Sequence, residues 1–136
     1  MFYFDIATDS GVLSGGGFSA AQAVIEAAGG RNVLEGLDNE QLTVSWETLA
    51  AKRPDFIVVG DYGGALSYEA SVRKLQTNPA TRDLPAVENE RFIRVPGFMM
   101  RPSPQMIVAA ERLRVALEEV GFLPDSEIDV GSELSP

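Results

Sequence analysis

Apolar residues recur along the chain in two spacings, which predict strands and helices in alternation. Alternating or continuous apolar runs, rich in aromatic and β-branched residues, predict strands at residues 2–7, 56–60 and 92–95. Apolar spacings of three and four residues, together with capping residues and prolines, predict helices at 18–28, 45–53, 67–77 and from Pro102 or Pro104 to 120.

Strands that alternate with helices predict an α/β fold: a three-layer, Rossmann-like lobe with a largely parallel sheet flanked by helices. Ligands of such sheets bind beyond the carboxyl ends of the strands. Three loops are expected there, at 8–17, 61–66 and 96–103. In this interpretation residues 1–123 form one lobe. Residues 124–136 are acidic and short of large apolar side chains, so we expect a mobile tail.

The composition of the chain disfavours some classes of partner and excludes some kinds of catalytic and metal site. The 136 residues carry 20 Asp and Glu against 11 Lys and Arg, a formal net charge of −9. Such a chain lacks the basic surface that nucleic acids and anionic membranes attract, so neither partner is expected. It holds no cysteine and no histidine, which excludes disulfides, Cys/His zinc sites, thiol catalysis and imidazole triads. No apolar run approaches the ~18 residues of a membrane span, and nothing after Met1 resembles a signal peptide.

Two features near the expected strand ends admit both a chemical and a structural interpretation. The run Gly15, Gly16 and Gly17 precedes a helix whose N-terminus could hold an anion, but we favour a turn with positive φ. Asp9 and Asp61 could serve acid–base chemistry or bind magnesium, and we favour turn capping because no lysine or histidine stands beside them. The sequence shows no catalytic constellation, so we expect neither an enzyme nor a resident cofactor or metal.

The stretch 43–59 carries the most specific pattern. Glu47 opens a helix that stops before Pro54 and Asp55, and an apolar strand follows. This order resembles an element of the siderophore- and vitamin B12-binding proteins of ABC importers. Three further segments resemble that family in the same order: the helix and Ala-Gly-Gly-Arg-Asn step within 18–34, the Leu-Pro-Ala-Val-Glu-Asn-Glu-Arg-Phe run at 84–92, and the Ser-Pro start of the last helix at 103–104. Glu90 replaces the glycine that is usual in the third segment.

The resemblance is to the C-terminal lobe of such a protein. Family members have two α/β lobes joined by a long helix and hold the ligand between them. The resemblance therefore implies that the full-length parent has an N-terminal lobe and an export signal. It also implies that this parent acts extracytoplasmically, in the periplasm or lipid-anchored outside the membrane. In the family a glutamate of each lobe pairs with arginines of the ABC permease. By position Glu47 is the candidate here, although it also suits the dipole of its own helix. Trp46 beside it is either part of the docking surface or a packed aromatic residue.

The resemblance implies a transported metal chelate: an iron–siderophore complex, haem or cobalamin. The candidate ligand-binding residues stand in the strand-end loops: Tyr62, Phe98, Met100 and Arg101. An apolar cluster that ends in a cation suits a large chelate with some negative charge, although Met99 and Met100 suit an ordinary core equally well. We expect Tyr62 and Arg101 at the same sheet edge with partly exposed side chains. Met or Tyr could ligate haem iron, but the missing histidine disfavours haem.

A second function stays open from the sequence: a free-standing Rossmann-like nucleotide-binding or regulatory domain. Nucleotide binding in such folds calls for a regular glycine fingerprint and an acidic partner, and neither is clear around residues 15–17.

Overall fold

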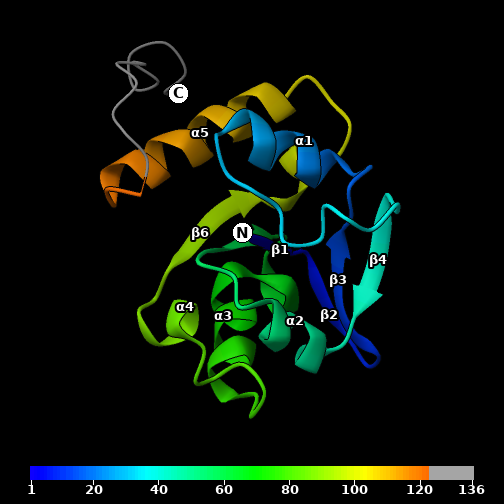
Figure 1. The fold of residues 1–136 in the computed structure, drawn as a ribbon, viewed down its shortest axis with the longest axis vertical. Coiled ribbons are helices and arrows are strands. Elements are labelled where there is room, and N and C mark those ends of the chain that lie inside the picture. The colour runs from blue at the N-terminus through cyan, green and yellow to red at the C-terminus, as the bar shows by residue number, and fades with distance from the viewer. Residues whose placement is uncertain (123–136) are drawn as a thin grey trace.

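The computed structural model describes residues 1–122 and shows two three-stranded sheets joined through one bent strand (Figure 1). A parallel sheet has the order β1 (Phe2–Phe4), β5 (Ile57–Asp61), β6 (Phe92–Pro96). An antiparallel sheet has the order β2 (Ile6–Thr8), β3 (Gly11–Gly15), β4 (Gln41–Val44). The tail predicted at 124–136, and residue 123, lie outside the described residues.

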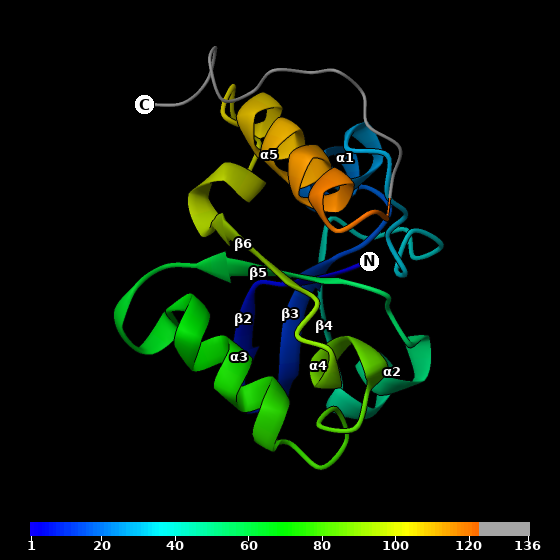
Figure 2. The ribbon, with the colours of Figure 1, turned by 90° about the vertical axis from the view of Figure 1, so that its left-hand side faces the viewer.

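The helices cover both faces of the parallel sheet (Figure 2). On one side lie α1 (Ala20–Ala27) and α5 (Met106–Glu119), and on the other lie α2 (Trp46–Lys52), α3 (Tyr68–Thr77) and α4 (Pro85–Glu88). Two single-turn 3-10 helices, η1 (Gly64–Leu66) and η2 (Gly97–Met100), follow β5 and β6. The predicted α/β fold, with a parallel sheet flanked by helices, is confirmed. Within residues 1–122, no helix has the length and apolar character needed to cross a membrane.

Two apolar cores follow from the alternation of side chains along β1 and β5. Tyr3 and Val58 point to the α1 and α5 side, where they join one buried cluster. Phe4 and Val59 point to the other side and join a second cluster beneath α2, α3 and α4. The central strand is therefore buried on both faces, as its continuous apolar run predicted.

The sequence did not predict the antiparallel sheet. Residues 2–7 form two strands instead of one, and the loop expected at 8–17 contains β3. The side chain of Thr8 closes the hairpin by donating to the carbonyl of Gly11 at 3.3 Å. Gly11 has a φ of 143°, and a Cβ there would overlap the backbone of Val44 on the neighbouring strand. A loop reading by composition missed this pairing because Gly and Ser dominate β3.

Candidate functional site

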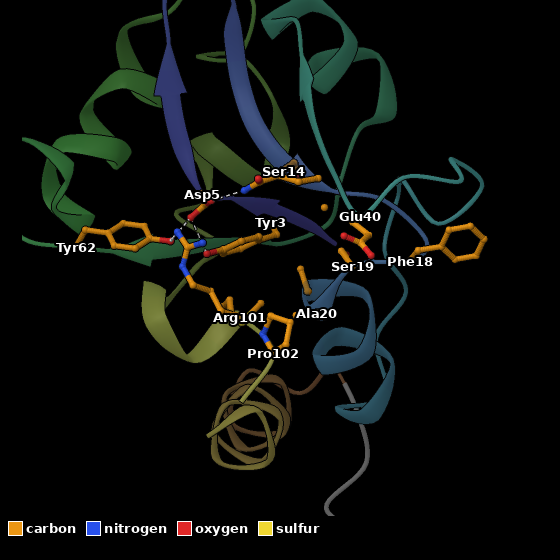
Figure 3. A pocket seen from close by; sticks show the side chains of 14 residues that line it. Tyr3, Asp5, Ser14, Phe18, Ser19, Ala20, Glu40, Tyr62, Arg101 and Pro102 are labelled. Carbon is orange, nitrogen blue, oxygen red and sulfur yellow. Dashed lines mark hydrogen bonds between the residues drawn. The ribbon is translucent and has the colours of Figure 1, made fainter. Parts of the chain in front are cut away.

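A pocket of about 230 Å³ opens where all three strands of the parallel sheet end (Figure 3). Asp5 follows β1, Tyr62 follows β5, and Arg101 follows η2 at the end of β6. The start of α1 and the end of β3 form the opposite wall, with Gly15, Ser19 and Ala20. This is the edge where ligands of parallel α/β sheets bind.

Asp5 is the centre of the polar network in this pocket. Its backbone N–H donates to the carbonyl of Leu13 at 3.0 Å, so the chain leaves the parallel ladder for the antiparallel one at this residue. Its side chain is buried, with 5% of the residue exposed. Tyr3 donates its hydroxyl proton to Oδ1 of Asp5 at 3.0 Å, and Tyr62 donates to the same oxygen. Gln41 Nε2 approaches Oδ2 at 3.5 Å.

The two tyrosines differ in access to the pocket. Tyr3 is 4% exposed and packs within the core between the sheet and α5. Tyr62 is half-buried and lies against Gly97, where any Cβ would overlap its ring. Burial raises the pKa of Tyr3, and the negative charge of Asp5 raises it further. Burial also raises the pKa of Tyr62, followed by its hydrogen bond to Asp5.

Arg101 completes the network at the solvent side. Its Nη2 donates to the hydroxyl oxygen of Tyr62 at 3.4 Å, and its guanidinium lies 5.9 Å from the centroid of that ring. Its electrostatic interaction with the Tyr62 hydroxyl, followed by this hydrogen bond, raises the pKa of Arg101. Among the described residues Arg101 forms no ion pair within 4.0 Å, and its side chain is exposed.

Three of the four predicted ligand-binding residues line the pocket, and Phe98 does not. Tyr62 and Arg101 lie at one sheet edge, as expected, and both line the pocket. Met100 also lines the pocket, yet it is 4% exposed and belongs to the core, so its packing role is plain. Phe98 is 52% exposed but is not part of the pocket wall. Met99 packs against the same core as Met100.

The predicted docking residues lie on α2, on the other side of the sheet from α1 and η2 (Figure 2). Glu47 is exposed in the first turn of α2, after the N-cap Ser45. Trp46 is half-buried and its ring centroid lies 5.9 Å from that of Phe4, so it packs against the core beneath α2. The docking role of both residues stays a prediction.

The two carboxylates that the sequence singled out stand outside the pocket wall. Asp61 Oδ1 accepts the backbone N–H of Gly63 at 3.0 Å and of Tyr68 at 3.1 Å, which confirms turn capping there. Its Oδ2 accepts Arg94 Nε at 2.8 Å. The bond from Gly63, opposed by burial, and then Arg94 hold the pKa of Asp61 below its usual value. Asp9 is exposed at the hairpin turn. No group of three acidic, His or Cys side chains within residues 1–122 could hold a metal ion.

The glycine run needs a different explanation from the predicted one. Among the glycines of residues 1–122, positive φ occurs at Gly11, Gly29, Gly63, Gly64 and Gly121, so the prediction for residues 15–17 was wrong. Gly16 is required because the segment after α1 passes close to it. A Cβ there would lie 2.6 Å from the carbonyl oxygen of Asn39 and 2.7 Å from that of Leu37.

Sequence reasoning missed Asp5 and Tyr3, because both stand inside a strand that was interpreted as core. The signal was present: one carboxylate interrupts an aromatic run that is otherwise apolar. A buried charge needs partners, so this residue could have been identified as a site candidate.

Several solved structures are similar to this chain. The chain is similar to a periplasmic binding protein from Veillonella parvula, with 26% identity and a TM-score of 0.74, over 87% of this chain and 41% of that one. It is similar to the periplasmic haem-binding protein BhuT, solved with two haems, at 28% identity and a TM-score of 0.63, over 85% and 44% of the two chains. An ABC-type Fe3+-hydroxamate transport protein from Saccharomonospora viridis shares the fold at 23% identity and a TM-score of 0.69, over 88% and 40%.

The chain spans less than half the length of each of these structures. No curated protein sequence matches it. A family model described as periplasmic binding protein matches residues 1–97, which is most of the chain. The chain therefore belongs to the periplasmic binding protein family.

Proposed function

We propose that this lobe forms half of the ligand cleft in the solute-binding component of an ABC importer for metal chelates of the iron–siderophore, haem or cobalamin type. The observation that carries the proposal is the pocket beyond the parallel strands, in which Asp5, Tyr62 and Arg101 meet. Similarity to proteins named for Fe3+-hydroxamate transport and haem binding supports this ligand class. The family's name supports a parent that works in the periplasm.

The chemistry of the pocket suits part of a large chelate better than a complete small molecule. Its volume of about 230 Å³ lies below the roughly 300–1,000 Å³ typical of sites that enclose a small ligand. Arg101 offers N–H donors to carboxylate, hydroxamate or catecholate oxygens, and such charge-assisted bonds are among the strong ones. The exposed ring of Phe18 at the start of α1 adds apolar surface at the rim. We propose binding and delivery to a permease, not catalysis.

The nucleotide-binding alternative loses its support. The run at residues 15–17 packs against the carbonyl groups of residues 35–39, so these glycines serve a close backbone approach. Two of the neighbouring structures are named for ABC-type Fe3+-hydroxamate transport and for haem binding, and neither name refers to a nucleotide ligand.

Glu47 is proposed as the contact of this lobe with permease arginines. Its side chain is exposed and, within residues 1–122, has no ion-pair partner. The neighbouring Trp46 is anchored in the core, which would hold the glutamate in a fixed place.

The ligand role is tested by difference absorbance and calorimetry with this chain at millimolar ferric hydroxamate, haemin, cobalamin or ATP. We expect one of the chelates to bind and ATP not to bind. Arg101→Gln should weaken chelate binding about tenfold, the effect of losing one charge-assisted hydrogen bond. Arg73→Gln removes another exposed arginine, from α3, and should change nothing. Binding of ATP alone, or equal affinity for Arg101→Gln and wild type, would overturn the proposal.

A further inference from the structure

The loop that carries Tyr62 has little apolar packing of its own. Residues 63–66, which follow Tyr62, are exposed, and both Gly63 and Gly64 have a positive φ. Even Leu66, the one large apolar residue among them, is 37% exposed. A segment with so few buried apolar contacts has low local stability unless hydrogen bonds hold it. The position of Tyr62 in the pocket therefore depends on the hydrogen bonds of this loop.

Asp61, at the end of β5, closes the loop through one oxygen atom. Its Oδ1 accepts the N–H of Gly63 at 3.0 Å and the N–H of Tyr68, the first residue of α3, at 3.1 Å. Within this closure the N–H of Tyr62 donates to the carbonyl of Leu66 at 3.0 Å. Hydrogen bonds from backbone N–H groups to an ionised carboxylate are stronger than those between neutral groups. One side chain thus joins the strand, the loop and the start of α3.

The other oxygen of Asp61 connects the loop to the next strand. Oδ2 accepts Arg94 Nε at 2.8 Å, and β6, which carries Arg94, continues into Gly97, where the ring of Tyr62 lies. The side chain of Arg94 is 59% exposed, so this ion pair alone contributes little stability. Its effect is geometric, because it ties the loop that carries Tyr62 to the strand whose end contacts the ring.

We propose that Asp61 is a positioning residue, which holds Tyr62 in the pocket with its hydroxyl on Asp5 before a ligand arrives. The inference rests on the proposed function, in which Tyr62 is part of the wall that a chelate contacts. Asp61 does not line the pocket, so it acts through Tyr62. A preformed wall binds more tightly, because the loop and its side chain do not have to be ordered on binding.

The first test needs no ligand and follows the ionisation of Tyr62 by absorbance. The difference between each protein and its Tyr62→Phe counterpart separates this group from the other two tyrosines. Burial and then the hydrogen bond to Asp5 raise the pKa of Tyr62, and Asp61 is not among the main causes. If Asp61→Ala releases the ring toward solvent, the pKa should fall toward its ordinary value of about 10.

Two further variants show whether the capping oxygen is what matters. Asp61→Asn keeps an oxygen that can accept from the two backbone N–H groups, so it should keep the raised pKa of Tyr62. Asp83→Ala removes an exposed carboxylate that also pairs with an arginine, Arg82 at 3.9 Å, but does not touch the loop. It should leave the pKa of Tyr62 unchanged.

The second test is a double-mutant cycle, measured by calorimetry with ferrioxamine, haemin and cobalamin. Asp61→Ala should weaken the binding of the chelate up to about tenfold, the size expected from ordering one side chain on binding. In a Tyr62→Ala background the same change should weaken binding less than about twofold, because no side chain is left to position. A residue that only stabilised the lobe would weaken binding equally in both backgrounds.

The outcomes separate the two proposals. An unchanged pKa of Tyr62 in Asp61→Ala, or equal weakening with and without the Tyr62 side chain, would overturn the positioning role and leave the proposed function intact. Asp61→Ser, whose single oxygen can still cap one N–H, replaces Asp61→Ala if that variant does not fold, and should show both changes at smaller size. If none of the three chelates binds wild type, the proposed function fails, and the absorbance titration still decides whether Asp61 holds Tyr62.

Discussion

Replacing Gly97 by alanine tests how closely the site is fitted around Tyr62. The added Cβ would meet three ring atoms of Tyr62, and even Cε2, the farthest of the three, would lie only 2.5 Å away. An ordinary contact at that position is 3.4 Å or more, and the nearest ring atom, Cζ, would lie at 2.2 Å, so the ring has to move by at least about 1.2 Å. The φ of Gly97 is not positive, and the effect therefore comes from the contact and not from backbone strain.

The magnitude follows from what the displaced ring loses. Overpacking a well-packed site costs about 1–3 kcal/mol, and an open hydrogen bond to Asp5 adds about 1 kcal/mol. Tyr62 is half-buried, so its ring can turn toward solvent and relieve part of the overlap. We therefore expect Gly97→Ala to lower the free energy of unfolding by about 1–2 kcal/mol.

Urea unfolding followed by the fluorescence of Trp46 measures this cost, because Trp46 is the single tryptophan and packs on Phe4 in the folded core. Gly36→Ala is the matched control, since nothing lies within 4 Å of its added Cβ. It should change the free energy of unfolding by less than about 0.5 kcal/mol. Equal stability of Gly97→Ala and Gly36→Ala would refute the close fit of Tyr62 against η2.

Four further predictions concern stability, pH, docking and the divided cleft. Asn32→Ala should lower the free energy of unfolding by about 2–3 kcal/mol in urea titrations. The reason is that the buried amide of Asn32 donates to the carbonyl of Gly15 and accepts from the N–H of Leu34. Asn89→Ala, at an exposed site, should lower it much less. Because the pKa of Tyr3 is raised, the folded state keeps the phenol protonated. The contribution of Tyr3 to the free energy of unfolding is therefore complete below the ordinary tyrosine pKa of about 10 and decreases as pH rises above it. In thermal melts across this pH range, the melting temperature of Tyr3→Phe should fall less than that of wild type. Glu47→Arg in the full-length parent should abolish transport and leave chelate affinity unchanged, whereas equal transport would remove Glu47 from the interface. If the parent binds at micromolar to nanomolar concentration, this lobe should bind about a thousandfold or more weakly by calorimetry, and tight saturable binding would mean that one lobe holds the whole site.

The fold was predictable to the extent that it depends on side chains that face a core. The run at 57–59 is β-branched and apolar without interruption, and it forms the central strand that is buried on both faces. Ser45 caps α2 as expected, and the chain turns at Arg53 before Pro54. The antiparallel sheet was not predictable in this way, because β3 consists of Gly, Ser and two apolar residues whose pairing is set by backbone contacts with β2 and β4.

Of the pocket residues, only those in the loops after the strands were predictable from the sequence. Tyr62 and Arg101 follow strand ends in the sequence, and general rules for parallel sheets place such residues at the ligand edge. Whether a strand-end residue reaches the pocket depends on local turns: η2 directs Met100 into the core, leaves Phe98 exposed outside the wall, and brings Arg101 back over Tyr62. The spacing of residues in the sequence does not predict which of these side chains reaches the pocket.

The stability of the fold does not explain why Asp5 is a buried carboxylate. A carboxylate with 5% exposure costs free energy to desolvate, and among the described residues it has no ion-pair partner within 4.0 Å. Hydrogen bonds from Tyr3 and Tyr62 offset part of that cost, but an apolar residue at the bend between β1 and β2 would avoid it altogether. Sequences break local rules of this kind at sites that bind or react. Asp5 is a buried carboxylate of this kind, because it accepts from Tyr3 and Tyr62 at the wall of the pocket.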